Sequence, residues 1–151
     1  MSQISNTTYE YKPIIDLNHR HFRHTRGDIE VFGAWYGDRH EPCLALLPSR
    51  LIGQPDLNPC IVPLSAAWYY HEDNFDQPEM RERLTLMAKL LRLNPHSRSD
   101  RMAILRAIAN HYDDLLNMPP RPKDGQRVVA DAVTYDSETG TERSAEIVDY
   151  V

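Results

Sequence analysis

Apolar residues recur every three or four positions between residues 76 and 118, which is the period of an amphipathic α-helix. Asn94-Pro95 divides this region into two helices, because a residue that precedes proline disfavours helical geometry. The repeated positions are Met80, Leu84, Met87 and Leu91 in the first helix and Leu105, Ile108, Tyr112 and Leu115 in the second. Three further leucines widen the first apolar stripe: Leu86, Leu90 and Leu93. We therefore expect a deeply buried first helix and, from the short connection, an antiparallel helical hairpin.

Both predicted helices carry residues suited to their ends. Asp76 can cap the first helix, with Pro78 in its first turn. Ser97 to Asp100 has the form of a capping box for the second helix, which Pro119-Pro120 is expected to end.

The first half of the chain has shorter apolar runs that prolines and turn residues separate. Residues 28–36 are rich in β-branched and aromatic residues and predict a strand, followed by a turn at Gly37–His40 and a return strand at Cys43–Leu47. The other predicted elements here are a strand over residues 9–15, a strand after Asn58-Pro59 and a short helix over residues 65–73 with Ser65 as its cap.

Residues 126–151 predict a β-hairpin, with Gly140 supplying the left-handed position of its loop. The chain is accordingly expected to form a single α+β domain, in which an antiparallel sheet and hairpins pack on the antiparallel helical hairpin. Its parts are a β-rich region over residues 9–63, a helical region over residues 65–118 and the hairpin over residues 126–151.

Composition narrows the class of protein. With 151 residues, 41% hydrophobic and 26% charged, the chain has the size and composition of one globular domain. Residues 1–8 are polar and no apolar run approaches the length of a membrane span, so we expect a cytoplasmic protein that does not contact a membrane. Cys43 and Cys60 lie within apolar runs and are interpreted as reduced core residues.

The formal net charge of −5 conceals two blocks of opposite sign. Residues 81–106 hold seven Lys or Arg and two acids, a local net of +5. Residues 124–151 hold seven acids and two arginines, a local net of −5. Such blocks can pair with each other on the folded surface, or they can lie on separate faces exposed to solvent. Alternatively, one of them can present a charged face to a partner. The acidic candidates for contact with a partner are Asp131, Asp136, Glu138, Glu142, Glu146 and Asp149.

The densest group of potential ligands is the segment 19–26, which contains three histidines and three arginines and is expected to be a surface loop or a short helical turn. Imidazoles bind transition metals, which makes His19, His21 and His24 weak metal candidates. No single regular conformation brings all three together, and the interleaved arginines repel a cation. We therefore expect no bound metal and no other cofactor here, and the simplest expectation is that the arginines pair with nearby acids.

The same segment offers phosphate contacts through Arg20, Arg23 and Arg26 and base stacking through Phe22. The acidic net charge opposes nucleic acid at long range, so direct nucleic-acid binding is not expected. Adjacent aromatics on a strand point to opposite faces, which makes Trp35 or Tyr36 a candidate for contact with a protein partner unless another layer covers it.

No catalytic signature occurs in the sequence, and an enzyme is not expected. The function predicted from the sequence is a small non-enzymatic accessory or inhibitor protein, of the kind found in phages and mobile elements. It would dock on a larger protein or ribonucleoprotein complex that handles nucleic acid, through an acidic or aromatic surface. The alternative is a small metal- or nucleic-acid-binding protein that uses residues 19–26.

Overall fold

The computed structural model describes residues 15–52, 58–122, 127–136 and 141–150, and from residue 127 onward it describes the backbone only. Six strands form one sheet in the order β4-β3-β2-β1-β6-β5, and every neighbouring pair is antiparallel. The strands are β1 (Ile15–Arg26), β2 (Ile29–Tyr36), β3 (Glu41–Pro48), β4 (Cys60–Pro63), β5 (Arg127–Asp136) and β6 (Thr141–Tyr150).

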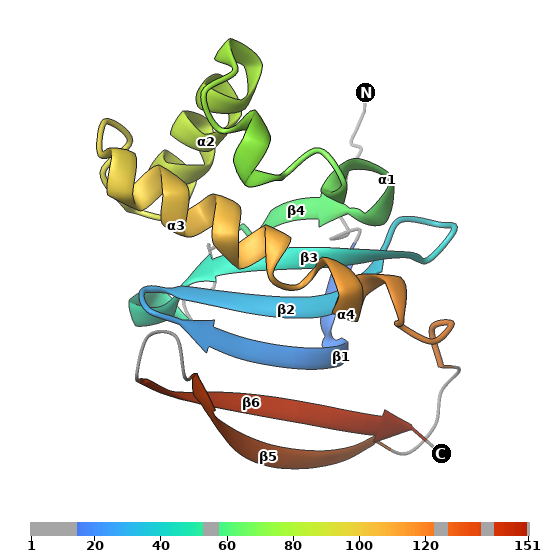
Figure 1. Ribbon diagram of the computed structural model, residues 1–151. Helices are drawn as coiled ribbons and strands as arrows, with labels where there is room; N and C mark the ends of the chain where they lie inside the picture. The colour runs from blue at the N-terminus through green and yellow to red at the C-terminus, as the bar shows by residue number, and fades with distance from the viewer. Residues whose placement is uncertain (1–14, 53–57, 123–126, 137–140, 151) are drawn as a thin grey trace, which may run out of the picture.

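The helices cover one face of strands β1 to β4 (Figure 1). They are α1 (Leu64–Ala67), α2 (Pro78–Leu90), α3 (Arg98–Ala109) and α4 (Tyr112–Leu116), with 3-10 turns η1 (Ser49–Leu51) and η2 (Glu72–Asn74). Helices α2 and α3 lie near the β4 side of the sheet, whereas hairpin β5–β6 forms the opposite end (Figure 1). The predicted α+β architecture is confirmed, including the β2–β3 hairpin and the strand pairing of β5 with β6.

The main core lies between the sheet and the helices. Its fully buried side chains include Leu44 on β3, Leu84 on α2 and Ile108 on α3. A smaller apolar cluster occupies the other face of the central strands and consists of Ile15, Phe32, Ala34, Cys43, Ala45 and Leu47. Strands β2 and β3 are therefore buried on both faces, which explains their continuous apolar sequence.

The largest correction concerns residues 19–26, which form most of strand β1 instead of a loop or helical turn. Gly27, at φ +60°, occupies a tight turn that joins β1 directly to β2. Phe22 lies opposite Gly33 of β2, and its ring occupies the space that a Cβ at Gly33 would take. Charged and polar residues hid this strand, because Phe22 is the only apolar residue between positions 19 and 26.

The helical region also differs from its prediction in detail. Leu86 and Leu90 were expected to be buried but are 55% and 56% exposed, since the buried stripe of α2 is narrower than the leucine content suggests. The second helix breaks after Ala109 and resumes as α4, which ends at Leu116 before the two prolines.

The N-cap residues of two helices and the length of one short helix also differ from the predictions made from the sequence. Gln77, and not Asp76, is the N-cap of α2, while Ser97 caps α3 as expected by accepting the backbone N–H of Asp100. The expected helix over residues 65–73 is only the short α1, capped by Pro63, followed by η2. Most of the strand expected over residues 9–15, and Gly140, lie outside the described residues.

Candidate functional site

Hairpin β5–β6 is the outermost part of the sheet, and β5 is its edge strand among the strands that the structure describes. The hairpin joins the domain through β1, at the register pairs Phe22↔Ile147, Arg23↔Glu146 and His24↔Ala145. Strand β5 has ten residues and no proline. The opposite edge strand, β4, has four residues and ends at Pro63, a common way of blocking further pairing.

The acidic residues of the hairpin are divided between its two faces by the strand register. Asp131 lies directly opposite Glu146, and Glu142 lies opposite Tyr135, so these three acids occupy one face of the hairpin. Asp136 and Asp149 occupy the other face, and Glu138 lies outside the described residues. Two like charges at directly opposed positions repel each other, which favours a cationic partner for this surface.

The basic block does not lie beside the acidic one. It falls mainly on α2 and α3, at the far end of the sheet from β5–β6 (Figure 1). Some of its charges are matched locally, by Arg83–Glu79 at 3.0 Å, Arg98–Asp76 at 3.1 Å and Arg106–Glu72 at 2.7 Å. The two blocks therefore lie toward different ends of the sheet (Figure 1), and these three ion pairs join basic residues to acids outside the hairpin.

Two candidate arginines of β1 form hydrogen bonds within the protein, and Arg23 pairs with an acid, as the simplest expectation from the sequence had it. Arg23 donates from Nε to the buried carboxylate of Glu30 at 2.7 Å and lies over the ring of Phe32. Arg20 donates from Nη1 to the carbonyl of Leu17 at 3.1 Å. Phe22 is buried against the helical layer, so it is not available to stack on a base.

The aromatic candidates are also covered. Trp35 is buried under the helical layer and donates its indole N–H to the carbonyl of Pro119 at 3.0 Å. Tyr36 is half-buried and packs on the smaller apolar cluster of the opposite face. Among the residues whose burial the structure describes, the exposed large aromatic side chain is instead Trp68, at the end of α1.

The two cysteines behave as core residues. Burial, together with the nearby Glu41 carboxylate, raises the pKa of the Cys43 thiol to about 12. Burial alone raises the pKa of the Cys60 thiol to about 11. Nucleophilic cysteines have a lowered pKa in an exposed, electropositive setting, which neither of these thiols has.

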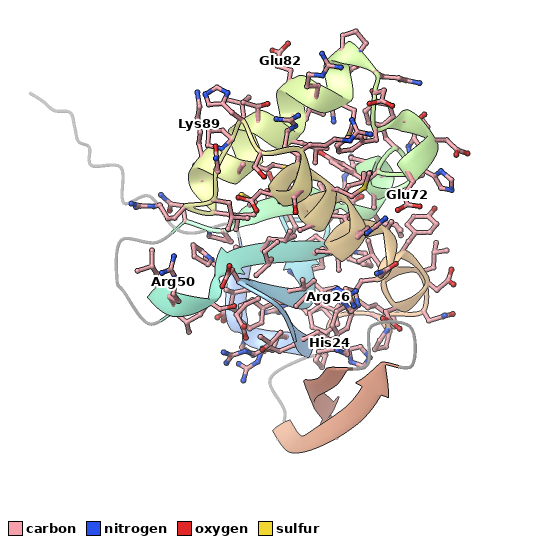
Figure 2. All side chains as sticks on the ribbon, turned by 60° about the vertical axis from the view of Figure 1, so that its left-hand side comes forward. His24, Arg26, Arg50, Glu72, Glu82 and Lys89 are labelled. Carbon is pink, nitrogen blue, oxygen red and sulfur yellow. The ribbon has the colours of Figure 1, made fainter. Side chains whose placement is uncertain are left out.

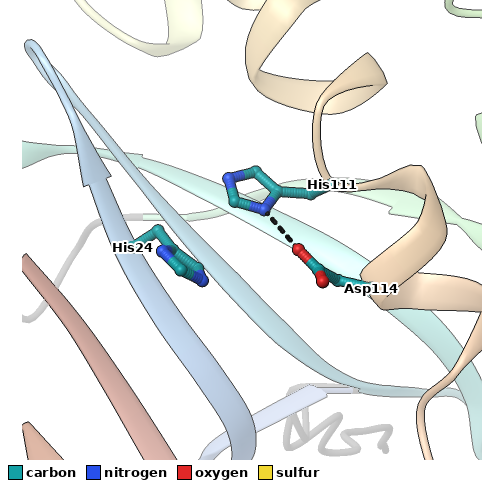
Figure 3. Close-up of side chains that lie close together, drawn as sticks. All are labelled: His24, His111 and Asp114. Carbon is teal, nitrogen blue, oxygen red and sulfur yellow. Dashed lines mark hydrogen bonds and ion pairs between the residues drawn. The ribbon is translucent and has the colours of Figure 1, made fainter. Parts of the chain in front are cut away.

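A cluster of ligand-type side chains joins β1 to α4 (Figure 3). His24, His111 and Asp114 each place one ligand atom within 4.8 Å of the others. His111 is the N-cap residue of α4, and its Nδ1 lies 3.0 Å from Oδ2 of Asp114, three residues later. Of the three histidines singled out from the sequence, only His24 belongs to this cluster. The spacing His111-x-x-Asp114 is the local signal that could have found the rest.

The other two candidate histidines lie elsewhere on β1. Nδ1 of His19 lies 2.8 Å from Oδ2 of Asp16, and both side chains are partly exposed. His21 lies beside Trp35, with ring centroids 6.4 Å apart. The structure thus separates the three histidines, as expected, and joins one of them to residues that are 87 or more positions away.

Protein-family models, curated proteins and solved structures contain no match to this chain. Within the described residues, none of the helices has the length and apolar content needed to cross a bilayer.

Proposed function

We propose that the protein is a non-enzymatic accessory or inhibitor protein that docks through hairpin β5–β6 on a basic surface of a larger complex. The observation that carries this proposal is the placement of a long, proline-free edge strand within the most acidic segment of the chain. An edge strand offers main-chain hydrogen bonds to a partner, and the acidic side chains select a cationic one.

A protein or ribonucleoprotein partner suits this surface better than bare nucleic acid. Phosphates would be repelled by Asp131, Glu142 and Glu146, which share one face of the hairpin. Complexes that handle nucleic acid present basic grooves, which an acidic hairpin can occupy. The buried, unbridged thiols of Cys43 and Cys60 agree with a reducing compartment, and we place the protein in the cytoplasm.

Affinity capture from the native host tests the proposal if matched variants are compared. The test variant neutralises one face of the hairpin with Asp131→Asn, Glu142→Gln and Glu146→Gln. The control variant makes the same change in net charge at exposed acids elsewhere, with Asp38→Asn, Asp73→Asn and Glu82→Gln.

The wild type and the control variant should recover the same partner, and the hairpin variant should recover at least about tenfold less. Circular dichroism and thermal melting must show that all three proteins fold. Equal recovery by the two variants would place the docking surface elsewhere. Recovery that nuclease treatment abolishes would favour direct nucleic-acid binding.

A further inference from the structure

We propose that His24, His111 and Asp114 form a binding site for one divalent first-row transition-metal ion. The inference is independent of the docking proposal, because it rests on the junction of β1 and α4 and not on the hairpin. Figure 3 shows the three side chains facing one another across this junction, His24 from the strand and the other two from the helix.

The donor set is the first argument. Two imidazoles and one carboxylate are ligands that zinc, cobalt and iron(II) accept, whereas calcium and magnesium prefer oxygen ligands alone. Three protein ligands also leave coordination positions for water, as in sites that are not purely structural.

The distances are the second argument. Metal–ligand bonds of about 2.1 Å place neighbouring donor atoms about 3.0 Å apart at the right angles of an octahedral site and about 3.4 Å apart in the tetrahedral geometry of zinc. Nδ1 of His111 and Oδ2 of Asp114 are 3.0 Å apart, so a metal ion can replace the hydrogen that they share. The three ligand atoms lie within 4.8 Å of one another, and a shift of at most about 2 Å would bring His24 to a ligand spacing.

The surroundings hold the two imidazoles in place. The rings of His24 and His111 have centroids 4.6 Å apart. Phe22 packs against both, with ring centroids 5.5 Å from His24 and 5.8 Å from His111, and the absence of a side chain at Gly33 leaves room for the Phe22 ring. Such packing reduces the rearrangement that metal binding requires.

Burial and charge define how an ion could enter. The side chain of His111 is 3% exposed, whereas that of Asp114 is 52% exposed, so the site opens to solvent on the carboxylate side. Arg26 lies two residues beyond His24 on β1, and Figure 2 shows the two side chains near each other. Its positive charge opposes a cation, and the carboxylate of Asp114 offsets that charge at the open side.

The chain supplies matched controls for this site. His19–Asp16 and His71–Asp73 are also histidine–carboxylate pairs, at 2.8 Å and 3.4 Å. Neither pair belongs to a group of three potential ligands among the described residues. If a histidine beside a carboxylate were sufficient, these pairs would bind metal as well.

The test is titration of the full-length protein, purified without a histidine tag and stripped with a chelator, with Zn²⁺ and separately with Co²⁺. We expect one equivalent to bind, with a cobalt d–d absorption band. At a free zinc concentration of about 100 times Kd, Tm should rise by roughly 5–10 °C. His24→Gln and Asp114→Asn should each raise Kd at least about tenfold.

His19→Ala and His71→Ala should leave Kd unchanged. The substituted side chains of His24 and Asp114 are partly exposed, so the metal-free variants are expected to fold, and their Tm without metal verifies this. Absence of a saturable one-equivalent site in the wild type would overturn the proposal. Binding that survives in both cluster variants, or that depends on His19 or His71, would also overturn it.

Discussion

At the scale of single residues, the buried carboxylate of Glu30 shows how the fold satisfies a polar group in its interior. Glu30 on β2 is 2% exposed, and its carboxylate accepts hydrogen bonds from Arg23, Thr25 and Ser49. These donors come from β1 and from the turn after β3, so one carboxylate ties three segments together. A buried charge is tolerated only when it is satisfied in this way.

Glu30→Ala should therefore lower the free energy of unfolding by about 2–4 kcal/mol, because three donors lose their acceptor and one of them is charged. Urea denaturation measures the change. Glu82→Ala, which removes an exposed carboxylate on α2, is the control and should change stability by less than about 0.5 kcal/mol. Similar losses in the two variants would contradict the assignment of Glu30.

The cysteines predict how stability depends on alkaline pH. Burial raises the pKa of Cys43 from 9.0 to about 12 and that of Cys60 from 9.0 to about 11. Above pH 9 the unfolded chain therefore loses thiol protons that the folded protein keeps, and stability falls as pH rises. Between pH 8 and pH 10 each thiol should lower the free energy of unfolding by about 1 kcal/mol.

Replacing both cysteines with alanine should remove this part of the alkaline loss, although the variant starts from a lower stability at pH 8 because it has cavities. The comparison needs urea melts of both proteins at the two pH values. A double variant with the same alkaline loss as the wild type would show that the thiols already ionise in the folded protein.

At the scale of elements, helices α2 and α3 show how far an apolar pattern determines packing. The spacing Met80, Leu84, Met87, Leu91 identified the buried face of α2, and all four residues are buried. The extra leucines at 86 and 90 lie on the exposed side. Hydrophobic character alone did not distinguish the buried leucines from the exposed ones, because they differ only in their angular position around the helix.

Leu105→Ala on α3 should destabilise the protein by about 2–5 kcal/mol, because Leu105 is fully buried between the helices and the sheet. Leu90→Ala on α2 makes the same chemical change at an exposed position and should alter stability by less than about 1 kcal/mol. Chemical denaturation of the two variants measures the change in the free energy of unfolding. A loss of stability as large for Leu90→Ala as for Leu105→Ala would mean that the helix faces are assigned wrongly.

Strand β1 could not be predicted from the pattern of apolar and polar residues. Its sequence is polar over residues 19–26, and one of its faces carries ion pairs such as Arg23–Glu30. The His24–His111–Asp114 cluster was hidden for a related reason. His24 is 87 or more positions away from His111 and Asp114, and only the docking of α4 on β1 brings it to them. Local spacing can indicate the His111–Asp114 pair, but it contains no information about the contact of that pair with His24.

At the scale of the whole molecule, charge is separated along the sheet. The basic helices α2 and α3 lie toward one end, and the acidic hairpin β5–β6 forms the other (Figure 1). The sequence revealed both blocks and the fold class, because charge and periodicity are local properties. It left open whether the blocks meet, and strand order supplies the answer: three strands, β1 to β3, separate β4 from the hairpin. The docking proposal requires an acidic end that lies apart from these basic helices.

The most direct test of that proposal is the association rate with the captured partner, measured against ionic strength. Raising salt from about 0.05 to 0.5 M should slow association of the wild type at least about tenfold, because screening removes electrostatic steering. The Asp131→Asn, Glu142→Gln, Glu146→Gln variant should associate more slowly at low salt and depend less on salt, and the Asp38→Asn, Asp73→Asn, Glu82→Gln control should resemble the wild type. A wild-type rate that does not change with salt and equals that of the hairpin variant would contradict docking through β5–β6.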